Sequence, residues 1–154
     1  PPPPPPPPPP PHPHPAARKP MTEYEKMAFG QQLYATTGVG DFDTAETMLT
    51  DDFFIIEAEG LPMAGEYRGK RALRDLYSHV FGTLKVADLE PEGMTVGGDY
   101  VINVISFRFE DPSLASAQLA ELFRFRDGKV CEIRPYYFDP KPIVDAWAHY
   151  SSAA

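Results

Sequence analysis

Residues 119–137 constrain the fold more than any other segment, because two alternating runs of apolar and polar residues flank Asp127-Gly128. An Asp-Gly pair in that position is typical of a two-residue turn in an antiparallel β-hairpin. Successive side chains of a strand point to opposite faces, so the first strand places Phe123 and Phe125 on a core face. The same phase places Glu121 on that face, where a carboxylate is unexpected.

The segments before this hairpin are first helical and then extended. A capping box in Thr22–Glu25 predicts a helix to about Thr37 that stops at Gly38 and Gly40. Further helices are expected at 43–49, 69–81 and 143–150, with Gly82 ending the second of these. Strands are expected at 53–59, 84–96, 100–110, 116–126 and 129–138, with a break at Pro91 in the second strand. This order predicts an α+β fold, in which a curved antiparallel sheet wraps around a long helix and encloses a cone-shaped cavity.

Composition divides the chain into a tail and one domain. Residues 1–20 hold 14 of the 20 prolines and are expected to be a disordered or extended tail, whereas residues 21–154 form the folded domain. Arg18 and Lys19 are two of the 14 basic residues, so the domain has 12 basic residues against 22 acidic ones. An acidic domain argues against nucleic acid or a membrane surface as the partner.

Two further features concern location. The single cysteine, Cys131, rules out an internal disulfide and fits the reducing cytoplasm. No apolar run is long enough for a membrane span, and the first residues do not have the pattern of a signal sequence. A cytoplasmic protein is therefore expected.

Two polar side chains, Asn103 and Glu121, share the core face with apolar residues. Alternation predicts that Glu132 and Arg134 point to solvent instead. The other inward positions of the last three strands include Phe107, Phe123, Cys131, Ile133 and Tyr137. Because a buried unpaired carboxylate is costly, an inward glutamate takes a proton or finds a partner.

Several arrangements of these polar groups remain open. In one arrangement, Glu121 lines a cavity as a neutral acid. In the others, it is exposed to solvent at the open end of the cone or at a dimer contact, or it pairs with an arginine. Asn103 alone fits a satisfied core amide. Glu57 faces either way, because its strand does not alternate cleanly. Tyr34, late in the first helix, is a phenol donor if it points into the cavity, and Tyr77 belongs to the buried stripe of the third helix.

This combination resembles the nuclear-transport-factor-2-like (NTF2-like) superfamily, especially its SnoaL-like and ketosteroid-isomerase-like members. The resemblance runs from about Thr22 to Asp139 and is carried by "GDFDTAETMLTDDFFI", "YRGKRALRDLY" and "ELFRFRDGKVCEIRPYY". It implies a cone-shaped α+β barrel with a long N-terminal helix and two further helices. The fold hosts isomerases, cyclases, dehydratases, epoxide hydrolases and non-catalytic binders, so the resemblance alone names no reaction.

Resemblance to ketosteroid isomerase also implies site residues. Its general base follows an Asp-Asp pair by five residues, which corresponds to Glu57, and its oxyanion-side acid precedes Phe-Arg-Phe by two residues, which corresponds to Glu121. The helix tyrosine matches less well, since its register falls one place before Tyr34. Both acids are aspartates in the isomerase, and the extra methylene moves each carboxyl by about 1 Å, enough to alter proton transfer.

We therefore expect a cofactor-independent enzyme that transfers a proton on a small hydrophobic carbonyl-bearing substrate, as an isomerase, cyclase or dehydratase. Glu57 would be the general base, and protonated Glu121 would hydrogen-bond the enolate oxygen with help from Tyr34 or Asn103. The ligand would contact Asn103, Phe107, Phe123, Tyr137 and Tyr77. No metal is expected, because the two histidines of the domain lack ligand spacing.

The rival expectation is a non-catalytic small-ligand-binding or dimeric scaffolding domain. Tyr100, Tyr136 and Phe138 would then form the partner surface on the outer face of the sheet. In either case we expect a homodimer through that face, which also carries Val104, Ser106 and Leu122, because an exposed apolar sheet face favours association.

Overall fold

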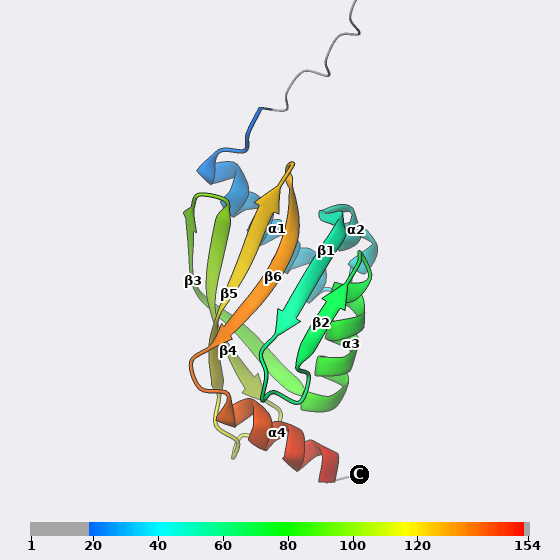
Figure 1. Cartoon of the computed structure of the whole chain (residues 1–154). Coiled ribbons are helices and arrows are strands. Elements are labelled where there is room, and N and C mark those ends of the chain that lie inside the picture. The colour runs from blue at the N-terminus through cyan, green and yellow to red at the C-terminus, as the bar shows by residue number, and fades with distance from the viewer. Residues whose placement is uncertain (1–18, 153–154) are drawn as a thin grey trace, which may run out of the picture.

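The computed structural model describes residues 19–152 (Figure 1). Most of the expected proline-rich tail lies outside these residues. The helices are α1 Glu23–Gly38, α2 Phe42–Thr47, α3 Ala72–Leu84 and α4 Lys141–Ser152. The strands are β1 Leu49–Glu57, β2 Gly65–Arg68, β3 Val86–Gly97, β4 Tyr100–Phe109, β5 Ala117–Arg126 and β6 Lys129–Tyr137. The order of helices and strands confirms the expected α+β class.

One curved sheet holds all the described strands, in the order β2-β1-β6-β5-β4-β3. Neighbouring strands are antiparallel except β1 and β6, which are parallel. In Figure 1, α1 passes behind the sheet, α3 stands beside β2, and α4 lies at the far end of the strands. The face toward α1 and α3 is called the inner face below, and the opposite face the outer face.

The core lies between the inner face and α1. A close approach fixes this helix against the sheet at Gly30, where an added Cβ would lie 3.3 Å from Val101 Cγ1. Buried residues of the inner face include Phe123 and Ile105, and Leu33 of α1 meets them with 1% of its surface exposed. This packing turns the inner positions of β4, β5 and β6 toward the helix.

Three local signals have the expected structure. The Thr22 side chain accepts from the Glu25 backbone N–H, and the Glu25 carboxylate accepts from the Thr22 N–H, which completes the capping box. Asp127 and Gly128 both have positive φ, 52° and 76°, as a type I′ hairpin turn requires. The register of β3 shifts between Pro91 and Gly93, which is the expected break.

Several sequence-based boundaries were wrong. Gly82 does not end α3, which continues to Leu84 and closes at Lys85 with φ 48°. Leu49 opens β1 instead of closing α2, because Asp41 caps that helix and starts it earlier. The four-residue strand β2 was not predicted, since so short a segment carries too little alternation.

Cys131 also lies differently from the expectation. A bulge in the pairing of β5 with β6 falls next to it, so that Val130, and not Cys131, is opposite Phe125. Val130 joins the core cluster, whereas Cys131 is buried outside that cluster, near Arg126 and Arg124. A one-residue shift of phase at a bulge explains the error.

Within residues 19–152, no helix combines the length and apolar character needed to cross a membrane.

Candidate functional site

Two carboxyl groups lie on the inner face, on strands that flank β6. Glu57 is the last residue of β1 and has 6% of its surface exposed. Glu121 lies in β5, opposite Pro135 of β6 and Asn103 of β4, and retains partial exposure. Both side chains line one cavity, so the remaining surface of Glu121 faces an interior space. Among the described residues, no arginine or lysine forms an ion pair with either acid.

Each acid has a tyrosine hydroxyl near it. Tyr34 of α1 donates to Glu121 Oε1 at 2.7 Å, a short and well-formed hydrogen bond. Tyr137 of β6 approaches Glu57 Oε2 at 3.5 Å, which is at the limit of hydrogen bonding. The two carboxyls are therefore supported unequally.

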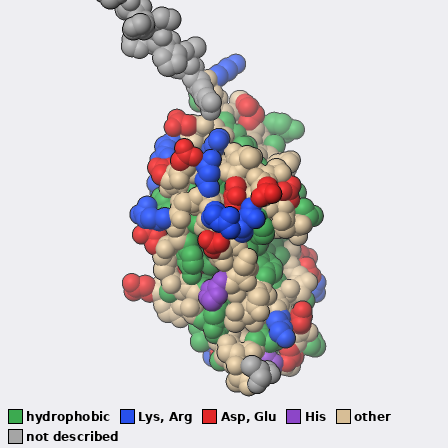
Figure 2. Space-filling model, turned by 90° about the vertical axis from the view of Figure 1, so that its right-hand side faces the viewer, with side chains coloured by type: hydrophobic (Ala, Val, Ile, Leu, Met, Phe, Trp, Pro, Cys, Tyr) green, Lys and Arg blue, Asp and Glu red, His purple; other side chains and the backbone are tan. Residues whose placement is uncertain are grey.

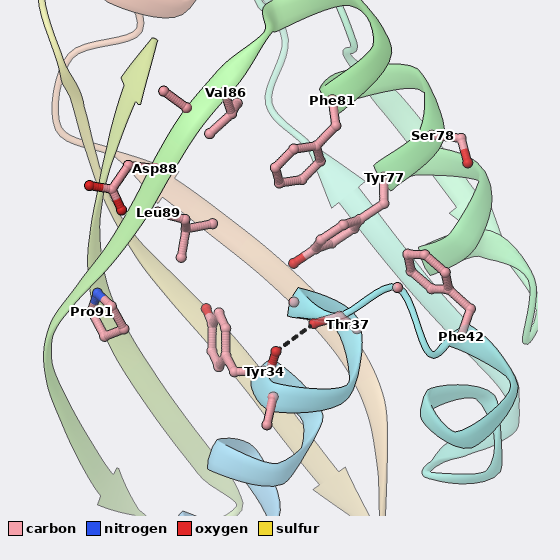
Figure 3. A pocket seen from close by; sticks show the side chains of 14 residues that line it. Tyr34, Thr37, Phe42, Tyr77, Ser78, Phe81, Val86, Asp88, Leu89 and Pro91 are labelled. Atoms are coloured by element: carbon pink, nitrogen blue, oxygen red, sulfur yellow. Dashed lines mark hydrogen bonds between the residues drawn. The ribbon is translucent and has the colours of Figure 1, made fainter. Parts of the chain in front are cut away.

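The Tyr34 ring and the Tyr34 backbone each have a stabilising contact. It stacks on Phe123 of β5 with ring centroids 5.3 Å apart. One turn later in the helix, the Thr37 hydroxyl donates to the Tyr34 carbonyl at 3.1 Å, as the dashed line in Figure 3 marks. Helix packing and ring stacking together fix the phenol that reaches Glu121.

Burial without a cation raises the pKa of both acids. The pKa of Glu57 rises to about 8, chiefly because it is removed from water and secondly because of the charge of Glu121. The pKa of Glu121 rises to about 7 for the same first reason, and the Tyr34 hydrogen bond opposes this rise. Burial also raises the pKa of Tyr34, Tyr77 and Tyr137, so these phenols remain protonated donors.

The cavity has two adjoining chambers. The inner chamber, with a volume of about 40 Å³, contains both carboxyls. The outer chamber, about 720 Å³, lies between α1, α3 and β3 and does not reach them. Tyr77, Phe81 and Leu89 line both chambers and mark the boundary where the chambers adjoin. Figure 3 shows the hydroxyl ends of Tyr34 and Tyr77 directed toward the middle of the outer chamber.

The residues that were expected to contact a ligand lie in three different places. Tyr77, Phe107 and Tyr137 line the inner chamber with the two acids. Phe123 is buried beneath Tyr34 and lines neither chamber. Asn103 is 3% exposed and lines a separate hollow beside Tyr34, and its Nδ2 has no hydrogen-bond partner among the described residues.

Sequence reasoning missed part of the site. Phe81 and Leu89 at the boundary, and Phe42 in the outer chamber, come from segments whose facing was not assigned. The helical spacing of Tyr77 and Phe81 on α3, whose rings stack 5.0 Å apart, is a signal that could have found one of them. Tyr67 of the unpredicted β2 lies close to Glu57. The pKa of Tyr67 is raised, first by burial and second by the charge of Glu57.

Glu132 on the outer face corrects another expectation. It was predicted to point to solvent, yet only 1% of its surface is exposed. Arg124 and Arg134 flank it, with nitrogen–oxygen distances of 2.8 Å and 2.6 Å. The two long arginine side chains cover the carboxylate, which explains its burial on a face that alternation assigns to water.

Several charged residues elsewhere are also paired. Figure 2, which looks onto the side that carries α3, shows acidic and basic side chains intermingled. Arg74 of α3 binds Glu46 at 2.8 Å and Asp43 at 2.6 Å. Within residues 19–152, His, Cys, Asp and Glu side chains do not gather in groups of three or more that could hold a metal ion.

Comparison with solved structures supports this fold. An NTF2-like protein from Burkholderia xenovorans LB400 is 24% identical, with 77% of this chain and 86% of that chain covered and a TM-score of 0.62. A second NTF2-like protein from the same organism is 21% identical, with 82% and 98% covered and a TM-score of 0.68. TerC, co-crystallised with polyporic acid, is 15% identical, with 80% and 98% covered and a TM-score of 0.66.

The fold is that of the NTF2-like class, an α+β domain with a curved sheet. The SnoaL-like domain model matches residues 31–133, which include Tyr34, Glu57 and Glu121. The chain therefore belongs to the SnoaL-like family. A search of curated proteins returned no match.

Proposed function

We propose that this protein is a cofactor-independent enzyme that transfers a proton on a small, hydrophobic, carbonyl-bearing substrate, in an isomerase, cyclase or dehydratase reaction. One observation carries the proposal: two carboxyl groups lie in the same small apolar chamber, each beside a tyrosine hydroxyl. Carboxyls with a pKa near neutrality suit general acid–base catalysis, because each can hold or release a proton at working pH.

The unequal support of the two acids suggests their roles. The 2.7 Å hydrogen bond from Tyr34 favours the carboxylate form of Glu121, whereas Glu57 has only a 3.5 Å contact. We therefore assign Glu121 as the base and protonated Glu57 as the acid, the reverse of the roles that the resemblance implies. Glu121 accepts the proton from the carbon beside the carbonyl, and Glu57 donates a hydrogen bond to the enolate oxygen. Return of the proton from Glu121 to a different carbon of a conjugated enolate completes an isomerisation, whereas return to the same carbon gives only exchange.

Proton exchange into a simple ketone tests the proposal without knowledge of the natural substrate. Purified protein is incubated in D2O with a benzo-fused cyclic ketone, 2-tetralone, and loss of the α-proton signal is followed by NMR. We expect wild type to exceed buffer, and Glu121→Gln to exchange about 100-fold or more slowly than wild type. Glu90→Gln, which changes an exposed acid, is the matched control. Exchange at the buffer rate with wild type contradicts the proposal.

A second candidate function is a dimeric binding or scaffolding domain. It is favoured by aromatic side chains on and beside the outer face: Tyr100 is 38% exposed, Tyr136 54% and Phe138 86%. Ile102, Val104 and Leu122 lie between them at outward positions of β4 and β5. We propose that this face forms a homodimer in either case. Light scattering at micromolar concentration tests it, and a mass near 17.1 kDa would contradict the dimer.

A further inference from the structure

The two chambers together fit an amphipathic ligand. The outer chamber has a volume of about 720 Å³ and a largely apolar lining, so it accommodates a ring system. The inner chamber, about 40 Å³, is far smaller than the outer one and has room for only a small group. A ligand that uses both would place an apolar body outside and a very small polar head beside the carboxyls.

The charges of the lining restrict that head group. Among the described residues that line the two chambers, Glu57, Glu121 and Asp88 are acidic and none is Lys, Arg or His. A carboxylate or phosphate head would therefore meet acidic groups with no compensating cation. A cationic head would supply the positive charge that the chamber lacks, because opposite charges interact strongly where water is excluded.

The hydrogen bonding of the acids leaves room for such a head. Glu57 is 6% exposed, and within residues 19–152 the 3.5 Å contact with Tyr137 is the one hydrogen bond of its carboxyl. Carboxylates are acceptors only, and an ammonium has three donors and no acceptor. Tyr77 and Phe81 at the boundary present aromatic rings, which also attract cations.

We infer that the site binds the protonated primary amine of an amphipathic ligand, with the ammonium between Glu57 and Glu121 and the apolar body in the outer chamber. This inference uses the same cavity as the proposed proton transfer and goes beyond it. It concerns which head group the chamber selects and does not require turnover.

Three probes of one shape test the inference: 2-naphthylmethylamine, 2-naphthylmethanol and 2-naphthoate. Binding to the full chain is measured by calorimetry at about pH 8, where a primary ammonium with a pKa of ~10 is still charged. We expect the amine to bind about tenfold or more tightly than the alcohol, and the carboxylate to bind more weakly than both. Equal or tighter binding of the alcohol or the carboxylate, or no binding of any probe, overturns the inference.

Variants locate the preference in the chamber. Glu57→Gln/Glu121→Gln should lose the preference for the amine and keep the affinity for the alcohol, because the glutamines retain shape without charge. Glu90→Gln should keep the preference, and melting temperatures confirm that each variant is folded. An amine preference that survives in the double variant overturns the inference. Amine binding without ketone exchange leaves the inference standing and contradicts only the proposed reaction.

Discussion

Both faces of the sheet bury a glutamate, and their surroundings differ. Glu132 on the outer face is 1% exposed and lies between two arginines. Glu57 on the inner face is 6% exposed, and among the described residues its side chain has only a distant tyrosine hydroxyl as a hydrogen-bonding contact. Burial is thus nearly equal, whereas two arginines compensate the charge on the outer face and no arginine or lysine of the described residues pairs with the acid on the inner face.

This difference separates a structural acid from a candidate functional one. Arginines beside a buried carboxylate balance its charge, so neither a proton nor a ligand is needed to hold that charge. A buried acid without a cation holds a proton or awaits a ligand, which is the state that acid–base chemistry uses. By exposed fraction alone, Glu132 would be a stronger candidate than Glu57 for a functional buried acid. The arginines beside Glu132 make Glu57 the stronger candidate instead.

The largest expected effect comes from removing the arginines of the outer pair. Arg124→Leu/Arg134→Leu leaves Glu132 without its cations, so the free energy of unfolding should fall by about 3 kcal/mol. Adding Glu132→Leu should restore most of the loss, because no uncompensated charge remains. Urea denaturation monitored by circular dichroism measures both changes.

The matched change on the inner face should have the opposite sign. Glu57→Leu and Glu121→Leu each remove an acid that has no cation, so the free energy of unfolding should stay the same or rise. If these variants lose as much stability as the double arginine variant, then the inner acids are structural and the contrast between the faces fails.

An intermediate effect is expected in the pH dependence of stability. The inner acids have raised pKa values in the folded protein, about 8 and about 7, against 4.5 as their ordinary value. As pH rises above about 4.5, the unfolded chain releases these protons first, so stability falls with pH until about pH 8 and then levels off.

The glutamine variants test this pH dependence. Glu57→Gln/Glu121→Gln should remove a decline of about 2 kcal/mol or more between pH 5 and pH 8, measured as free energies of unfolding across that window. A wild-type decline that the double variant fully retains would assign the titration to other groups.

The smallest effect is expected from the phenol that contacts Glu121. Tyr34→Phe removes a donor to the carboxylate, so the pKa of Glu121 should rise by up to about 1 unit. Tyr100→Phe, which changes an exposed outer tyrosine, is the control. Carboxyl-detected NMR titration measures the shift, and an unchanged Glu121 pKa would show that the hydrogen bond does not form in solution.

The sheet and its faces could be predicted because alternation and turn residues are local signals. Asp127-Gly128 determined the hairpin, and the phase of β5 placed Glu121 inward. Cys131 was misassigned because a bulge changes phase by one residue and has no sequence signature here. Glu132 was misassigned because alternation assigns a face but not the arginines that cover it.

The site was predictable only in part for a similar reason. The resemblance located Glu57 and Glu121, but not the unequal hydrogen bonds that distinguish them. The division into two chambers depends on how Phe81 of α3 and Leu89 of β3 lie at their boundary. This arrangement joins a helix and a strand, so the residue pattern of neither segment predicts it. Such contacts follow from packing and not from the pattern of one segment.

Direct titration of the inner carboxyls tests the central claim, which is that two buried acids share a chamber without a cation. Carboxyl-detected NMR on wild type, with Glu57→Gln and Glu121→Gln to assign the signals, gives each pKa in the folded protein. The account predicts about 7 for Glu121 and about 8 for Glu57, with Glu121 ionising first. Values near 4.5 for both would contradict it, because they would mean that water or a cation already compensates these charges.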